Sequence, residues 1–168
     1  MIQVIHGEIW AEDLTELNQL MLDYQSCLRF ACCRFSKDKM EFNDVRRVAK
    51  IKFSRLNSRQ STDAVLEGQT NYKVFLVHQK ELLETKLDLE KELKNKKISP
   101  RKKIKLQKRL KKIKYKLKNP RIIFGGQEAW NDLKSGKITK KQWLDHRNSQ
   151  IYARGEKSRS GNVNIRVV

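Results

Sequence analysis

The sequence predicts a mainly α-helical protein with a small β unit, which is an α+β fold. Apolar residues recur at steps of three and four along most of the chain, the spacing of amphipathic helices. Short β-branched segments lie near both ends, where strands can pair with each other across an inserted helical module. We therefore expect a helical lobe, with a long antiparallel helical hairpin, inserted into a small β-barrel-like unit formed by the N- and C-terminal strands.

The boundaries of these parts follow from changes in the pattern. Residues 1–10 and 120–168 are assigned to the β unit, and residues 11–119 to the helical lobe, whose hairpin covers residues 58–118. Residues 2–10 have the mixed, β-branched pattern of a strand. A regular apolar stripe then predicts a helix over residues 12–36. The stripe consists of Leu14, Leu17, Met21, Tyr24, Leu28, Ala31 and Phe35.

The next two helices lead into the hairpin. Asn43 or Asp44 can cap a second helix. A third helix begins at Ser58 or Ser61 and runs to Leu93, a length of about 50 Å at 1.5 Å per residue. Such a helix must extend beyond a small bundle.

The return of the hairpin has a clear start signal. Ser99 can act as the N-cap and Pro100 occupies the first helical position, where its missing N–H costs nothing. The facing apolar stripe consists of Ile104, Leu106, Leu110, Ile113 and Leu117. Two such stripes predict an antiparallel helical pair.

The pattern changes again after Pro120. Gly125 and Gly126 predict a turn, and the final strand reaches the end of the chain. The predicted elements are, in order, a strand over 121–124, helices over 127–134 and 139–148, and strands over 150–154 and 162–168. Because an unpaired terminal strand favours aggregation, we expect further protein to follow it.

Positive charge is concentrated in one segment. Residues 94–118 contain fourteen Lys or Arg and no Asp or Glu, in a chain of net charge +19. Five acids and two lysines over residues 81–92 can neutralise part of this charge across the hairpin. The remaining self-repulsion favours a polyanionic partner, of which nucleic acid is the first candidate. The alternative is a solvated coiled-coil arm that only keeps the protein soluble.

Three groups of residues are expected to contact nucleic acid. The basic helix would hold phosphates without reading sequence, and the other two groups would supply any discrimination between bases. The groups are Ser58, Arg59, Gln60 and Ser61; Lys102, Lys105, Arg109, Lys112 and Lys116; and Arg147, Asn148, Tyr152, Arg154, Lys157 and Arg159. The third group could instead be an ordinary polar hairpin.

The sequence shows no signature of catalysis, of a metal site or of a cofactor. None of the three histidines lies in a nucleophile motif, no phosphate-binding loop is present, and Asp145 is only a mild candidate for nuclease chemistry. The cysteines lie on one helix without a second cluster, so we expect reduced, partly buried thiols at Cys27, Cys32 and Cys33. Without a secretory signal or a membrane span, a cytosolic protein is expected.

Two groups of short motifs along the chain together carry a family resemblance. The more specific group is Arg121-Ile-Ile-Phe-Gly-Gly126, Leu133-Lys-Ser-Gly-Lys-Ile-Thr139, Trp143, Arg147-Asn-Ser-Gln-Ile-Tyr-Ala-Arg-Gly155 and Gly161-Asn-Val-Asn-Ile-Arg166. The second group is Tyr24-Gln-Ser-Cys-Leu-Arg-Phe30 and Leu56-Asn-Ser-Arg-Gln-Ser-Thr-Asp-Ala64. In this order the motifs resemble the TnpB family, the OrfB-type transposase-associated proteins of bacterial insertion sequences and relatives of the type V CRISPR nucleases. The resemblance spans essentially all 168 residues. Gln127 and Glu128 depart from it, since the family often has lysines there.

The resemblance implies the N-terminal portion of an RNA-guided DNA endonuclease. In the family this portion combines a wedge-like β-barrel with a helical recognition lobe, and holds guide RNA and target DNA. Cleavage belongs to a later RuvC-like domain with three acidic residues and a zinc-binding insert, which the motifs do not cover. The implied partners are thus guide RNA, target DNA and a separate or downstream RuvC-like domain, with no membrane and no enzymatic activity of its own. The alternatives are a free-standing DNA- or RNA-binding regulator and a structural coiled-coil protein.

Overall fold

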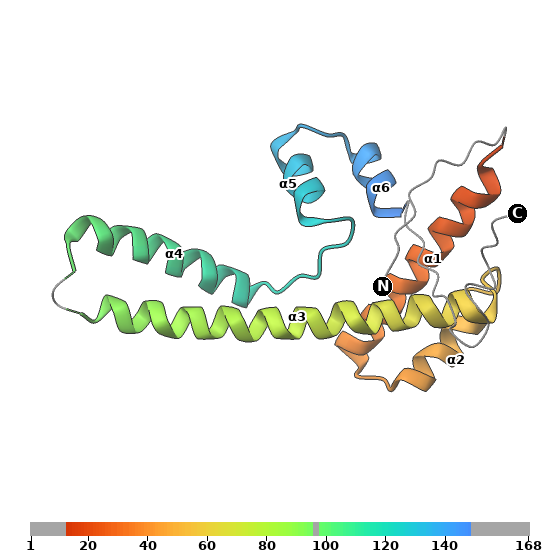
Figure 1. Cartoon of the computed structure of the whole chain (residues 1–168), viewed down its shortest axis with the longest axis horizontal. Helices are drawn as coiled ribbons and strands as arrows, with labels where there is room; N and C mark the ends of the chain where they lie inside the picture. The colour runs from red at the N-terminus through yellow and green to blue at the C-terminus, as the bar shows by residue number, and fades with distance from the viewer. Residues whose placement is uncertain (1–12, 96–97, 149–168) are drawn as a thin grey trace, which may run out of the picture.

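The computed structural model describes residues 13–95 and 98–148, and this part of the chain is mainly helical (Figure 1). Helix α3 forms the long axis; α1 and α2 pack beside its first half, and α4 returns along its second half. The elements are α1 Thr15–Cys33, the π-helical turn η1 Arg34–Asp38, α2 Phe42–Lys52, α3 Ser58–Leu93, α4 Pro100–Lys118, α5 Gln127–Ser135 and α6 Lys140–Asn148.

The prediction of a β-barrel-like unit, and with it of an α+β fold, is wrong. The described residues form helices and connecting segments but no strand. Residues 121–124, predicted as a strand, are irregular and extend from α4 toward the bundle, where Phe124 packs against the core. No described segment offers this short run a backbone partner, so its apolar side chain packs on helices instead. The other predicted strands, over 2–10, 150–154 and 162–168, lie outside the described residues.

The bundle is held by a core shared between α1, α2 and α3. Its buried members are Tyr24, Cys27, Leu28, Ala31, Phe35, Val45, Ala49, Leu56, Ala64 and Val65. Gly68 lets α1 and α3 cross closely, because a Cβ atom built there would lie 2.7 Å from the Leu28 carbonyl oxygen. The predicted burial of thiols is confirmed for Cys27 and Cys32, whereas Cys33 is exposed.

Helix α3 begins with a reciprocal cap. The Asn57 side chain accepts hydrogen bonds from the backbone N–H groups of Arg59 (3.0 Å) and Gln60 (2.8 Å). In return the Gln60 side chain accepts from the Asn57 N–H at 3.0 Å. This capping box satisfies donors that a helix start leaves open, and it fixes the predicted start at Ser58.

The predicted hairpin is present as α3 and α4. Ser99 and Pro100 occupy the predicted N-cap and first helical position of α4. The seam buries Leu89, Leu106 and Ile113, and is flanked by the partly buried Leu82, Leu93, Ile98, Leu110 and Leu117. Ile104, predicted to belong to the seam, is instead 54% exposed on the outer side of α4.

Two short helices form a second, smaller hairpin that returns to the bundle. Gly136, with φ of 75°, ends α5 as predicted, and the Thr139 hydroxyl accepts from the Gln142 N–H (3.3 Å) to cap α6. Trp130 and Trp143 pack against each other with ring centroids 5.6 Å apart. Helix α6 then lies against α1. Within the described residues, no helix is both long and apolar enough to cross a membrane.

Candidate nucleic-acid interface

Helix α4 has one face fixed by packing and another left to solvent. Leu106 and Ile113 lie on its inner side, seven residues and so about two turns apart, and both pack against α3. Every Lys and Arg of α4 is exposed. The apolar seam therefore orients the helix so that its cations can meet a ligand.

Two cations of α4 are neutralised across the seam. Lys102 Nζ lies 2.6 Å from a Glu92 carboxylate oxygen, and Lys114 Nζ lies 3.0 Å from one of Glu90. The hydrogen bond from Lys114 lowers the pKa of Glu90 below its ordinary value. The predicted internal neutralisation is confirmed for these two pairs.

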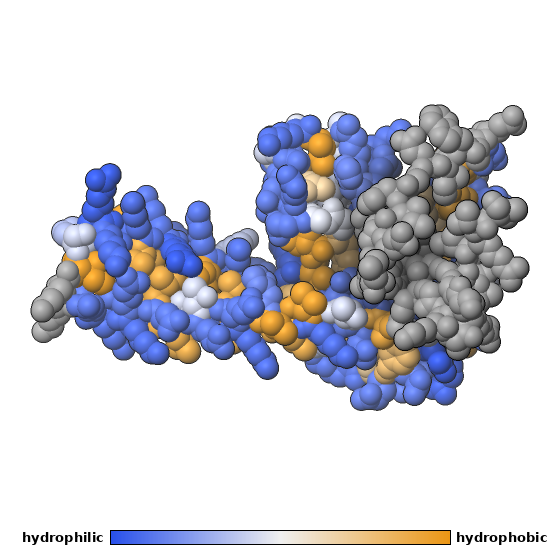
Figure 2. Space-filling model, in the orientation of Figure 1, coloured by the Kyte–Doolittle hydropathy of each residue, from blue (hydrophilic) through white to orange (hydrophobic). Residues whose placement is uncertain are grey.

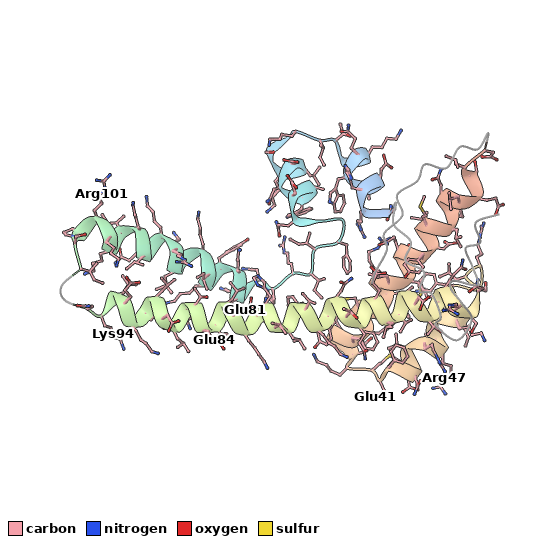
Figure 3. All side chains as sticks on the ribbon, in the orientation of Figure 1. Glu41, Arg47, Glu81, Glu84, Lys94 and Arg101 are labelled. Carbon is pink, nitrogen blue, oxygen red and sulfur yellow. The ribbon has the colours of Figure 1, made fainter. Side chains whose placement is uncertain are left out.

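The other nine cations of α4 have no acidic partner among the described residues. They are Arg101, Lys103, Lys105, Lys108, Arg109, Lys111, Lys112, Lys116 and Lys118. Figure 3 shows Arg101 on the side of α4 that faces away from α3, and in Figure 2 hydrophilic side chains cover most of the visible face of the hairpin. We call these nine residues the α4 cationic surface. Of the five predicted contact residues on this helix, four belong to it, and Lys102 is occupied by Glu92.

The predicted group at the start of α3 divides between structural and exposed positions. Gln60 is part of the capping box, and Ser61 is buried and donates its hydroxyl to the Ser58 carbonyl at 3.2 Å. Ser58 is exposed, and Arg59 is half-buried. The structure thus gives Gln60 and Ser61 roles inside the protein, which the sequence pattern could not distinguish from roles toward a ligand.

The predicted group near the C-terminus is described only at its first two members, both of which face α1. Asn148 accepts a hydrogen bond from the Arg29 guanidinium at 3.0 Å, and the Arg147 guanidinium lies 5.1 Å from the Trp143 ring centroid. Burial, and then the neighbouring charge of Arg147, lower the pKa of Arg29 to about 10. The hydrogen bond between Arg29 and Asn148 ties α6 to the bundle, whereas the contact between Arg147 and Trp143 lies within α6. The predicted contacts Tyr152, Arg154, Lys157 and Arg159 lie outside the described residues.

Sequence reasoning overlooked a second basic surface on α2. Arg46, Arg47 and Lys50 are exposed, and they line a surface groove of about 450 Å³ together with residues at the start of α3. Arg47 is partly neutralised by Asp44 at 2.9 Å. The signal was present, since Arg46, Arg47 and Lys50 lie outside the apolar stripe that contains the buried residues Val45 and Ala49.

The chemistry available at these surfaces is that of binding. Lys and Arg offer N–H donors and positive charge to phosphate oxygens. No group of three or more His, Cys, Asp or Glu that could hold a metal ion occurs in the described part of the chain. Burial raises the pKa of Cys27 to about 12, which makes this thiol a poor nucleophile.

Comparison of the chain with protein-family models, with curated proteins and with solved structures finds no match.

Proposed function

We propose that this protein binds nucleic acid, and that the α4 cationic surface supplies most of the affinity by contacting backbone phosphates. One observation carries the proposal: nine exposed cations lie along one helix with no acidic partner among the described residues. Placing so many like charges on neighbouring turns is unfavourable in the free protein. A phosphate backbone relieves this repulsion and releases its own counterions.

The dimensions of α4 suit this role. Its 19 residues span about 28 Å. Cations spread over that length can follow several successive phosphates of one strand, whereas a small anion would meet only two or three of them. The seam keeps the helix straight against α3, so binding requires little ordering of the backbone.

The resemblance to TnpB proteins supports a more specific proposal. We infer a nucleic-acid-binding portion of a TnpB-like system, which holds guide RNA and target DNA and leaves cleavage to a RuvC-like domain encoded separately or downstream. The motifs quoted above support it, and so does the helical lobe with its basic hairpin. The absence of a strand over 121–124 argues against a close match there. Such a protein would act in the bacterial cytoplasm, associated with the nucleoid.

The test is the salt dependence of binding to a labelled RNA and to a labelled DNA. A variant with four α4 cations changed to glutamine, Lys108, Arg109, Lys111 and Lys112, should lose about four units of the slope of log Kd against log salt concentration. Its affinity should fall at least ~10-fold at moderate salt. Circular dichroism should show an unchanged helix content.

A matched control removes the same charge elsewhere. Four exposed lysines lie away from α4, and changing them to glutamine should alter the slope by less than about one unit. They are Lys37, Lys73, Lys80 and Lys140. Equal losses in both variants would show that net charge, not the α4 cationic surface, drives binding. A wild-type protein that binds neither RNA nor DNA would favour the structural coiled-coil alternative.

A discrete RNA bound to the purified protein would distinguish the specific proposal from the general one. A TnpB-like protein should retain one RNA species through purification, which sequencing would identify. A free-standing regulator should instead prefer one DNA sequence, and a protein with no preference would contradict the TnpB-like proposal while leaving phosphate binding intact.

A further inference from the structure

Within the described residues, Tyr115 makes no contact that would explain a tyrosine at this position of α4. Its side chain is 66% exposed, and among the described aromatic residues it is the only exposed one. The others are used inside the protein: for example, Tyr24 donates its hydroxyl to Glu67, and Trp130 packs on Trp143. The Tyr115 hydroxyl makes no hydrogen bond within the described residues. An exposed ring of this size stands out on a helix whose other exposed side chains are mostly cationic.

Tyr115 lies among the cations of the last two turns of the α4 cationic surface. It lies two residues from both Ile113 and Leu117 of the seam, and so about 200° around the helix from each. Its neighbours on the helix surface are the residues three and four positions away. Three of these are Lys111, Lys112 and Lys118.

The faces of the ring remain open. Five contacts between a cation and an aromatic ring occur in the described residues, and they use Phe30, Tyr72, Trp130 and Trp143. None of them uses Tyr115, although lysines flank it. The ring is therefore available to a partner that has its own π-face.

We propose that Tyr115 stacks on an unpaired base of a single-stranded nucleic acid whose phosphates lie on the flanking lysines. This inference rests on the proposed function and names its ligand class. Every base has a π-face, and stacking on an aromatic side chain is the usual way in which proteins hold a single strand without reading its sequence. A duplex has its bases stacked internally, so it would use the lysines and leave Tyr115 in water.

The experiment compares two probes, a homopolymer single strand of about twelve nucleotides and a duplex of the same length. Tyr115→Ala should weaken binding of the single strand about 5- to 30-fold and that of the duplex less than about 2-fold. Tyr115→Phe retains the ring and should bind like the wild type. Strands that carry the same base on ribose and on deoxyribose show whether the sugar matters, since stacking itself is common to both.

Ile104 provides the matched control. It is 54% exposed on the same face of α4, eleven residues before Tyr115, and has no π-face. Ile104→Ala should leave both affinities unchanged. Equal losses from Tyr115→Ala and Ile104→Ala, or equal losses on both probes, would overturn the stacking proposal and leave phosphate binding standing. A wild-type protein that binds neither probe would overturn the proposed function itself.

Discussion

The two ends of α3 lie in different environments. In the bundle, Ala64 and Val65 are fully buried, and the backbone at Gly68 touches α1. In the hairpin, the helix is covered on one side only, and Leu89 is its one fully buried apolar residue. One continuous helix is thus surrounded at its beginning and half-covered at its end (Figure 1).

This difference shows that the residues that stabilise the fold and the residues that carry most of the positive charge lie in different parts of the protein. The bundle core joins three helices and contains residues far apart in the sequence, so it can hold the fold. The hairpin seam needs only enough packing to orient α4, and its cations stay in water, where charge costs little desolvation. We expect changes in the bundle to affect folding and changes in the hairpin to affect mainly the arm.

Replacing Gly68 with valine should have the largest effect. Any Cβ atom there would meet the Leu28 carbonyl oxygen at 2.7 Å, and the first two heavy atoms beyond it would force α1 and α3 apart. We expect a loss of about 3 kcal/mol in the free energy of unfolding, measured by urea denaturation. The buried Cys27 thiol should also become accessible to a labelling reagent.

Thr70→Val is the matched control, because Thr70 is exposed on the same helix two residues later. It should change the free energy of unfolding by less than about 0.5 kcal/mol. If Gly68→Val unfolded at the same urea concentration as the wild type, the stability of the bundle would not depend on the close crossing of α1 and α3.

Leu89→Ala should have the next largest effect, and it should be local. Removing this side chain, which is 3% exposed, leaves a gap in a thin seam and costs about 2 kcal/mol. Because α4 has few other anchors, hydrogen exchange should become faster in α4 than in α1. Leu87→Ala, at a position that is 54% exposed, should leave the free energy of unfolding and the hydrogen-exchange rates of α4 unchanged. Equal loss of protection in α1 would show that arm and bundle unfold as one unit.

The same contrast explains which parts of the fold could be predicted. Regular apolar spacing defines the helices well, and the predicted starts at Ser99 and Thr139 agree with the caps of α4 and α6. The predicted caps Asn43 and Asp44 instead lie inside α2, which begins at Phe42. The β unit was predicted from short apolar runs, for which local pattern does not decide between strand and irregular chain. At residues 121–124 the deciding factor is tertiary, because Phe124 packs against the bundle core and residues 13–95 and 98–148 provide no partner strand.

The charge of the candidate site could be predicted from the sequence, but the partners of its individual side chains could not. The cationic run itself marked α4, and four of five chosen residues lie on its free surface. Periodicity cannot say which lysine faces an acid across the seam, as Lys102 faces Glu92. Gln60 and Ser61 are polar residues at a helix start, where capping and ligand binding select the same residue types. Tyr115 was overlooked because its exposure depends on how α4 packs.

Glu67→Gln should give a smaller change, of the opposite sign. Burial raises the pKa of Glu67, and a hydrogen bond from the Tyr24 hydroxyl, at 3.0 Å, opposes the shift. Since the folded pKa exceeds the unfolded one, the ionised carboxylate destabilises the protein progressively as pH rises from the unfolded pKa through the folded pKa. Glutamine keeps an acceptor for Tyr24 without the charge.

We therefore expect Glu67→Gln to gain about 0.5 kcal/mol near neutral pH, a value reduced because the side chain is only half-buried. The gain should disappear in acid, where the carboxyl is protonated in both states. Urea denaturation at the two pH values is the measurement. A variant less stable than the wild type at neutral pH would show that the ionised carboxylate is favourable in the bundle.

The smallest predicted effect concerns the ion pairs of the hairpin. The hydrogen bond from Lys114 is the main cause that lowers the pKa of Glu90, and the charges of Lys114, Lys86 and Lys94 add to it. Because the pKa of Glu90 is lower in the folded protein than in the unfolded chain, its ionised carboxylate stabilises the fold. This stabilisation is fully present above the unfolded pKa and is lost as pH falls through the folded pKa. Because Glu90 is partly exposed, the pKa itself, followed by NMR titration of the carboxyl carbon, is a better measure than stability.

Lys114→Gln should return the pKa of Glu90 toward its ordinary value, whereas Lys108→Gln should leave it nearly unchanged. Both changes remove one charge from α4, but only Lys114 crosses the seam, with 3.0 Å between Nζ and the carboxylate oxygen. The two variants distinguish the effect of the direct contact from the effect of net charge. A general positive field would shift the pKa of Glu90 equally in both. Equal shifts would mean that the seam does not assign its lysines to partners, and that all the cations of α4 should be counted as one surface.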